Sequence, residues 1–293
     1  MLDAVINLLF NSLFLGSIYA LVGSSLTLLY GVASTCNLAE GDLMIVGSYL
    51  TYFLFVALGI IPLISILVVP LLLGILGLAL YRVGGFSTVL RKDTTRMNKE
   101  LSMAILTFAL TLIIDNIIAK IFTTNYKTFS YFTDIIEIMG FRFMLNKLFT
   151  IIISLIFIAF LLVILKRTWF GLGIRCVLND ELAAGVVGIE IDKVYLFTFF
   201  ISFAIAGMAG SLFSMNFYIS PYLGGELTMI AFVIVILGGS GSIRGALLGG
   251  MIFAFLETII TFFLSPLIRI GIIYLVLILF LLVKPKGLFK GGT

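Results

Sequence analysis

Acidic side chains inside or beside apolar runs are the residues of this chain with the clearest capacity for chemistry. Glu40 and Asp42 follow the end of one apolar run, Asp115 lies inside another and Glu257 inside a third. An ionised group at mid-membrane costs about 2.5 to 3.5 kcal/mol, so each should face a cavity or a partner rather than lipid. For Asp115 and Glu257 a functional role and a purely structural role, as a protonated or hydrogen-bonded link between helices, both stay open.

The polar interruption at residues 31–42 contains Asn37, Glu40 and Asp42 and has no lysine or arginine. An acidic segment with two glycines favours non-helical backbone that lines an aqueous cavity. The alternative is a short connecting loop in which Asp42 helps to cap the next helix. Tyr19 and Ser24, in the preceding apolar run, either line the same path or hydrogen-bond to neighbouring helices.

A short surface helix is predicted within residues 171–189. Asn179 can serve as its N-cap, Asp180 and Glu181 suit the first turn, and Gly188 can end it in the left-handed conformation. One face is apolar, formed by Leu182, Ala183, Val186 and Val187. About nine residues reach only about 13 Å, which is too short to cross a bilayer. The helix could dock on another protein or lie on its own membrane domain.

The composition explains what must position these residues. Hydrophobic residues make up 62% of the 293 positions and charged residues 11%, against about 45 to 50% apolar residues in soluble domains. Nine apolar runs are candidate membrane spans, at residues 4–30, 43–61, 62–81, 101–121, 148–165, 194–216, 227–238, 246–264 and 271–283. The seventh has only twelve residues and suggests a broken or re-entrant segment, so eight or ten spans are alternatives. The sequence predicts an all-α polytopic membrane protein with a bundle of 8 to 10 transmembrane helices.

Basic residues indicate the orientation of this bundle. Thirteen of the 18 lysines and arginines fall in alternate loops and in the tail, which places the C-terminus in the cytoplasm and the N-terminus outside. Small residues four apart mark expected helix interfaces at Gly16 with Ala20, Ala206 with Gly210, and Gly245 with Gly249.

Several kinds of chemistry are excluded by composition. Histidine is absent, and Cys36 and Cys176 share no CxxC spacing, so no metal site, cofactor or disulfide framework is expected. The glycine and serine run at 238–242 lacks the GK[ST] of an ATPase loop. We expect neither catalysis nor an ATPase in this chain, and no nucleic-acid partner.

Short motifs along nearly the whole chain resemble the membrane permeases of branched-chain amino acid ABC importers. They are LGSIYAL at 15–21, LYG at 29–31, NLAEGD at 37–42, GLGIR at 171–175, DELAA at 180–184, GI at 188–189, AGMAG at 206–210, SPY at 220–222, LGGSGSIRGA at 237–246 and PKGLF at 285–289. Each motif alone is weak, but their shared order is specific.

The resemblance implies one permease domain over residues 1–293 with a cytoplasmic coupling loop at 166–193, in the inner (plasma) membrane. It implies two ATP-binding-cassette ATPase subunits, a second homologous permease or a second copy of this chain, and an external substrate-binding protein. Coupling to the ATPases is assigned by the resemblance to Arg175, Asn179, Asp180, Glu181, Ala183, Ala184 and Gly188. The expected function is import of branched-chain or other hydrophobic amino acids by alternating access, along a path that includes Tyr19, Ser24, Asn37, Glu40, Asp42, Asp115 and Glu257.

One departure from the family pattern leaves the substrate open. The family commonly has phenylalanine and histidine where this chain has Leu38 and Glu40, and a carboxylate there would repel an amino acid's carboxylate or select its ammonium group. Relatives that carry urea or short amides are therefore an alternative. A different class, an ion-coupled secondary transporter that uses Asp115 and Glu257, is the rival function.

Overall fold

A computed structural model of the protein describes residues 2–33, 36–91, 96–138, 141–239, 241–263, 266–284 and 287–288. Helices dominate this part of the chain. In order, the elements are α1 (Leu2–Ala33), α2 (Glu40–Leu58), α3 (Pro62–Val83), α4 (Phe86–Arg91), α5 (Arg96–Phe122), β1 (Ile135–Ile138), β2 (Phe141–Met144), α6 (Leu145–Arg167), α7 (Trp169–Asn179), α8 (Glu181–Val186), α9 (Ile191–Ser214), η1 (Pro221–Leu223), α10 (Gly224–Gly238), α11 (Ile243–Phe263) and α12 (Pro266–Val283).

The expected polytopic helical fold is confirmed. Among the described residues, eight helical segments are long and apolar enough to cross a membrane. They coincide with the first eight predicted runs, and α12 covers the ninth run at 271–283. The main difference lies at α2, which begins at Glu40 rather than at residue 43, so Glu40 and Asp42 belong to a helix.

The short seventh run is a continuous helix with an irregular entry. α10 has 15 residues, or about 22 Å, less than the roughly 30 Å of a bilayer core. The 3-10 turn η1 precedes it directly, and Gly239 ends it with φ 97°. The departure from regular helix therefore lies at the two ends of this segment and not within it.

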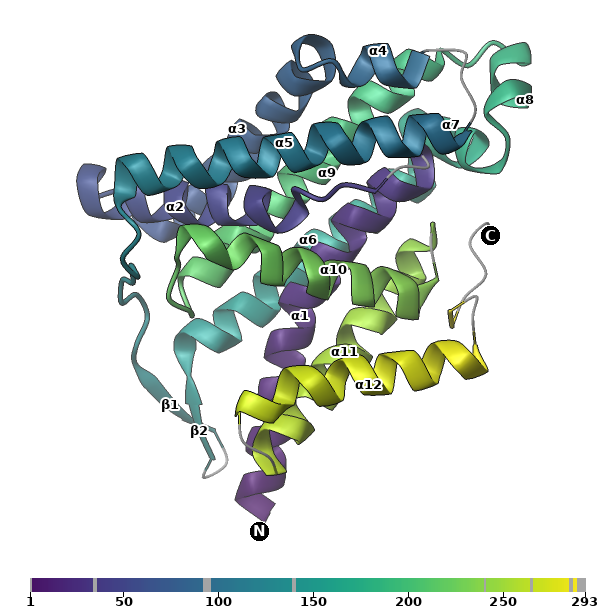
Figure 1. Ribbon diagram of the computed structural model, residues 1–293. Coiled ribbons are helices and arrows are strands. Elements are labelled where there is room, and N and C mark those ends of the chain that lie inside the picture. Colours follow the sequence, from purple (N-terminus) through teal and green to yellow (C-terminus); the bar gives the residue numbers. More distant parts are fainter. Residues whose placement is uncertain are drawn as a thin grey trace.

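The helix α1 forms the centre of the bundle and runs from the N-terminus to the opposite end of the molecule (Figure 1). It packs mainly against α11 and α9, while α9 also packs against α2 and α3. Ser25 and Ser202 exchange side chain to carbonyl hydrogen bonds of 2.8 and 3.1 Å across α1 and α9. Such hydrogen bonds, together with close packing, hold helices together where lipid supplies no hydrophobic driving force.

The small residues identified in the sequence do lie at helix interfaces. A methyl group on Gly210 would meet the Met44 carbonyl oxygen of α2 at 2.0 Å, and one on Gly245 would meet the Gly238 carbonyl oxygen of α10 at 2.1 Å. Gly16 lies directly against α11. The interfaces predicted from small residues four apart are confirmed.

The two ends of the bundle carry different structures. At the end with the N-terminus, β1 and β2 form an antiparallel hairpin with Ile135 opposite Met144, which the sequence did not predict; Phe143 contacts Phe10 of α1 at a ring distance of 4.6 Å. The short helices α4, α7 and α8 lie at the opposite end (Figure 1).

Candidate functional site

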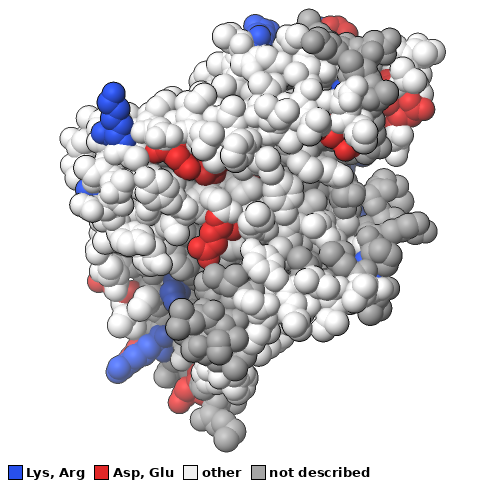
Figure 2. Space-filling model, viewed as in Figure 1, with Lys and Arg blue, Asp and Glu red and all other residues white. Residues whose placement is uncertain are grey.

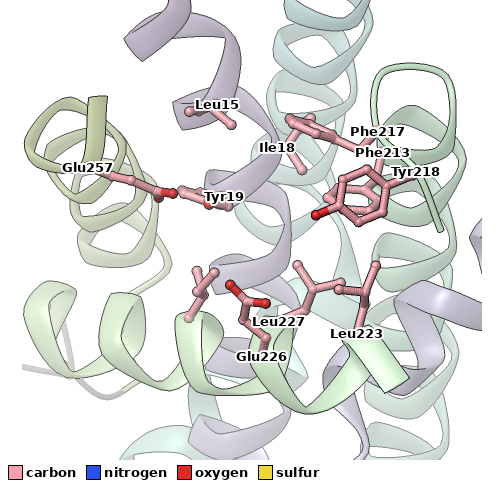
Figure 3. Close-up of a pocket in the computed structure, with 11 residues that line it drawn as sticks. Leu15, Ile18, Tyr19, Phe213, Phe217, Tyr218, Leu223, Glu226, Leu227 and Glu257 are labelled. Carbon is pink, nitrogen blue, oxygen red and sulfur yellow. The ribbon is translucent and has the colours of Figure 1, made fainter. Parts of the chain in front are cut away.

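A chamber of about 300 Å³ lies between α1, the end of α9, the start of α10 and the middle of α11. Figure 3 shows Glu257 extending from α11 toward Tyr19 on α1, with Glu226 reaching in from α10. We call it the central chamber. Its other walls are apolar or aromatic, formed by Leu15, Ile18, Phe213, Phe217, Tyr218, Leu223, Leu227 and Ile230.

The structure brings together two of the predicted path residues in this chamber, Tyr19 and Glu257. Both are buried, at 6% and 5% exposure, and both line the chamber. The prediction missed Glu226, which lies in the first turn of α10. An acidic residue at that position is typical of any helix start, so the sequence offered no distinctive signal for it.

A second chamber of about 610 Å³ adjoins the first, and both are lined by Leu15, Phe217 and Glu257. We call it the hairpin-side chamber, because its lining comes from the ends of α1, α6 and α11 that lie toward the hairpin. Its other lining residues are Asn7, Leu8, Asn11, Phe14, Lys147, Thr258, Thr261 and Phe262. The polar residues of this chamber other than Glu257 were missed, although Asn7 and Asn11 are one helical turn apart in an apolar run.

The ammonium group of Lys147 is held by α1. It donates a hydrogen bond to Asn11 Oδ1 at 2.8 Å and lies 5.4 Å from the centre of the Phe14 ring. The first is a charge-assisted hydrogen bond and the second has the geometry of a cation–π contact. The hairpin-side chamber thus has a positioned cation in its wall as well as the carboxyl group of Glu257.

The other predicted acidic residues lie in a separate place, which we call the polar break (residues 36–42). Its backbone is non-helical from 36 to 39, as one interpretation expected. Asn37, Glu40 and Asp42 are almost fully buried, and Asn37 Nδ2 donates to Glu40 Oε2 at 2.9 Å. None of these three residues lines either chamber.

Neighbouring helices supply the hydrogen bonds of the polar break. The Gly41 N–H donates to Thr228 Oγ1 of α10 at 2.8 Å, and the Leu38 N–H donates to Thr107 Oγ1 of α5 at 3.1 Å. Irregular backbone is tolerated at membrane depth when the protein satisfies it in this way. The capping role considered for Asp42 is wrong: the N-cap of α2 is Ala39, without a side-chain hydrogen bond, and Asp42 lies within the first turn.

Asp115 and Ser24 complete the predicted set. Asp115, on α5, is near enough to Asp42 for their charges to interact, so it belongs with the polar break and not with Glu257. Ser24 is fully buried and donates to the Leu21 carbonyl of its own helix at 2.8 Å. Six of the seven predicted path residues are therefore divided between two regions, and Ser24 belongs to neither.

The predicted surface helix is present but begins one residue later than expected. Asn179 is the last residue of α7 and not an N-cap, because α7, which the sequence did not predict, runs directly into this segment. Asp180 is the N-cap of α8, and its Oδ1 accepts hydrogen bonds from the Leu182 and Ala183 N–H groups at 2.9 and 3.0 Å. Gly188 follows with φ 91°, as predicted.

The two sides of the α7–α8 segment face different surroundings. Leu182, Val186 and Val187 are 83%, 89% and 81% exposed, so the predicted apolar face is not covered by the chain's own described residues. The opposite side is attached to the membrane domain, since Ala184 is buried and the Arg175 guanidinium donates to the Leu165 carbonyl at the end of α6.

On the face seen in Figure 2, most of the coloured and white surface is uncharged, and the charged side chains form small groups.

Comparison with known proteins agrees with this architecture. Residues 8–282 match the family model described as "Branched-chain amino acid transport system / permease component". The high-affinity branched-chain amino acid transport system permease protein LivH of Escherichia coli is 29% identical over 290 residues, which cover 96% of this chain and 94% of LivH.

Further relatives come from an archaeon and another bacterium. The probable branched-chain amino acid transport permease protein LivH of Methanocaldococcus jannaschii is 29% identical over 93% of this chain and 88% of its own length. BraD of Pseudomonas aeruginosa, a high-affinity branched-chain amino acid transport system permease protein, is 26% identical over 96% and 94%. No solved structure matches significantly. Because the family model covers nearly every membrane helix, the chain belongs to the permease component family of branched-chain amino acid transport systems.

Proposed function

We propose that this chain is one permease subunit of an ATP-binding-cassette importer, and that it moves branched-chain or other hydrophobic amino acids across the inner membrane by alternating access. The family and the relatives' names support the transport role and the substrate class. A single permease domain over residues 1–293 would form half of the path, together with a homologous permease or a second copy of the chain.

The exposed apolar face of α8 carries the proposal. Large aliphatic side chains that are more than four-fifths exposed, here Leu182, Val186 and Val187, are typical of a surface that another protein covers. The occupant we propose is an ATPase subunit. Arg175 and Ala184 attach the segment to the membrane domain, so a movement of the ATPase would pass into α6 and α9.

The distribution of charge supports a cytoplasmic location for α8. The segments with most lysine and arginine residues lead into or out of α4, α7 and α8, which lie together at one end (Figure 1). Under the positive-inside rule this end faces the cytoplasm, and the N-terminus and the hairpin face outside. An external substrate-binding protein would then deliver its cargo at the hairpin end.

Paired substitutions test the coupling role. Val186→Asp should lower ATP-driven leucine uptake by the assembled importer at least about tenfold, because it places a charge in a desolvated contact. Val83→Asp is the matched control: Val83 is 88% exposed and ends α3 at the same end of the bundle. Both variants should reach the membrane in wild-type amounts. Equal uptake by the two variants would contradict docking through α8.

The rival function, an ion-coupled secondary transporter, is not favoured. It required Asp115 and Glu257 to act as one relay, but Asp115 lies beside Asp42 at the polar break and Glu257 lines the chambers. Measurements of uptake into sealed membrane vesicles distinguish the two functions. Loss of uptake on deletion of the ATPase partner supports the importer, whereas uptake that survives without ATP and collapses with an uncoupler supports the rival.

A further inference from the structure

The hairpin-side chamber has groups of opposite charge in its wall. Lys147 enters from α6 and Glu257 from α11, and both line the same space of about 610 Å³. Glu257 also lines the central chamber, whose remaining walls include Leu15, Ile18 and Leu227. A solute at the junction of the chambers therefore meets a cation and a carboxyl group beside a mostly apolar space, whose wall also contains the carboxyl group of Glu226.

Lys147 is held in position and keeps donors for a ligand. Asn11 Oδ1 accepts from the ammonium at 2.8 Å, and a lysine ammonium has three N–H donors. The Phe14 ring, 5.4 Å away, further restricts where the charge can lie. A positioned cation in a half-buried wall suits a carboxylate, which accepts several charge-assisted hydrogen bonds.

Glu257 offers the complementary group. Its side chain is 5% exposed, and a buried carboxylate is costly unless a cation or hydrogen-bond donors accompany it. An ammonium group supplies both a positive charge and three donors. An ammonium group at this place can donate to the Glu257 carboxyl group, whereas an uncharged apolar group cannot.

The space beside these charges fits an apolar side chain. The two chambers, about 300 and 610 Å³, have the size of small-molecule sites, roughly 300 to 1,000 Å³. Aliphatic residues of α1 and α10 form much of the central chamber. A branched aliphatic side chain would be desolvated there.

We propose that Lys147 and Glu257 form a specificity site for zwitterions within the membrane path. Lys147 binds the α-carboxylate, Glu257 binds the α-ammonium group, and the side chain occupies the central chamber. This inference rests on the proposed transport function and gives the permease a selectivity of its own, separate from that of the binding protein. Urea and short amides, which lack separated charges, gain nothing from such a site.

Competition binding tests the site without transport. The assembled permease and ATPase complex, in nanodiscs and without the binding protein, is incubated with radiolabelled L-leucine. Unlabelled leucinamide, which lacks the carboxylate, and 4-methylpentanoate, which lacks the ammonium group, serve as competitors. Wild type should prefer leucine over each analogue by about 10- to 100-fold, the value of one hydrogen-bonded charge contact.

Each variant should lose only one of these preferences. Lys147→Met should accept leucinamide as well as leucine while it still rejects 4-methylpentanoate, and Glu257→Gln should show the reverse pattern. Asn11→Leu removes only the acceptor that holds Lys147 and should weaken the preference for leucine over leucinamide. This variant replaces Lys147→Met in the test if Lys147→Met does not assemble. A general loss of stability cannot produce opposite preferences.

Matched controls change charge away from the chambers. Lys120→Met and Glu137→Gln alter exposed residues of α5 and β1 and should leave both preferences as in wild type. Wild-type preferences retained in Lys147→Met and Glu257→Gln would overturn the site even if uptake is ATP-driven. If the two variants lose opposite preferences but uptake does not depend on the ATPase, the site is supported and the proposed function is refuted.

Discussion

Two regions of this protein bury acidic residues to nearly the same extent, but they differ in their relation to the two chambers. Glu40 in the polar break is 1% exposed and Glu257 in the chambers 5%. Glu40 accepts a hydrogen bond from Asn37, three residues away, and lines neither chamber, whereas Glu257 lines both. Burial of a carboxyl group therefore does not by itself distinguish a closely packed helix contact from the wall of a chamber.

The difference has a physical origin in what the neighbouring helices contribute. Around the polar break, α5 and α10 provide threonine hydroxyls that accept hydrogen bonds directly from backbone N–H groups, so the backbone there is both closely packed and hydrogen-bonded. Around the chambers, α1, α6 and α11 provide amide, ammonium and carboxyl groups at the edge of an open space. We infer that the polar break holds helices together and that the chambers admit solute.

Filling the tightest contact of the polar break should have the largest effect. A methyl group on Gly224 would lie 1.6 Å from Asp42 Oδ1, whereas one on the adjacent Gly225 would meet nothing within 4 Å. Gly224→Val should destabilise the protein by about 1 to 3 kcal/mol or more, the usual cost of overpacking. The measurements are the unfolding temperature in detergent and the yield of monodisperse protein.

Gly225→Val is the matched control for this prediction, with the same substitution one residue later in the first turn of α10. Its unfolding temperature should equal that of wild type. If the two variants unfold alike, the polar break is less closely packed than the contact with Asp42 implies, and a solute path through it would need to be reconsidered.

The same substitution at one threonine in each region should separate stability from transport. Thr228 Oγ1 accepts from the Gly41 N–H at 2.8 Å, and Thr228→Val leaves that buried donor unpaired at a cost of about 1 to 3 kcal/mol. Thr258, in the hairpin-side chamber, bonds only within its own helix, to the Ala254 carbonyl at 2.7 Å, among its described contacts. Thr258→Val should leave the unfolding temperature unchanged.

Leucine uptake should respond in the opposite sense. Thr258→Val should raise the apparent KM for leucine by about two- to fivefold, the value of a neutral hydrogen bond, while Thr228→Val should lower uptake only in proportion to the loss of folded protein. A raised KM in Thr228→Val with unchanged stability would place the polar break on the path and reverse the comparison.

The membrane helices were predictable from the sequence because an apolar run of bilayer length has few other structures open to it. α7 was not, since Gly171 and Gly173 are poor helix formers. At Gly171, a side chain would lie 2.2 Å from the Leu165 carbonyl oxygen, so tertiary contact with α6 explains a residue that local propensity disfavours. Its presence also moved the N-cap of α8 from Asn179 to Asp180.

The candidate site was predictable only in part for a similar reason. Acidic residues in apolar runs, such as Glu257, stand out in any sequence of this composition. Lys147 and Glu226 do not, because each lies near the start of a helix, where charged residues are common. Only the packing of α1, α6, α10 and α11 shows that Glu226 and Lys147 line two adjoining chambers, each together with Glu257.

The smallest effect concerns the thiol at the entrance of the polar break. Burial, and then the charge of Glu100, raises the pKa of Cys36 above its ordinary value of 9.0, so the unreactive protonated thiol predominates at neutral pH. Maleimide labelling of Cys36, followed by mass spectrometry in a Cys176→Ser background, should be slow at pH 7 and should still be accelerating above pH 9. Glu100→Gln should increase the labelling rate modestly, since it removes the lesser of the two causes that raise the pKa of Cys36.

A cysteine in the hairpin-side chamber provides the comparison. The thiol introduced by Thr258→Cys should label faster than Cys36, and leucine should protect it. Rapid labelling of Cys36 at pH 7 that leucine suppresses would mean that water and solute reach the polar break. The burial of Asn37 and Glu40 and the hydrogen bond between them argue against such access.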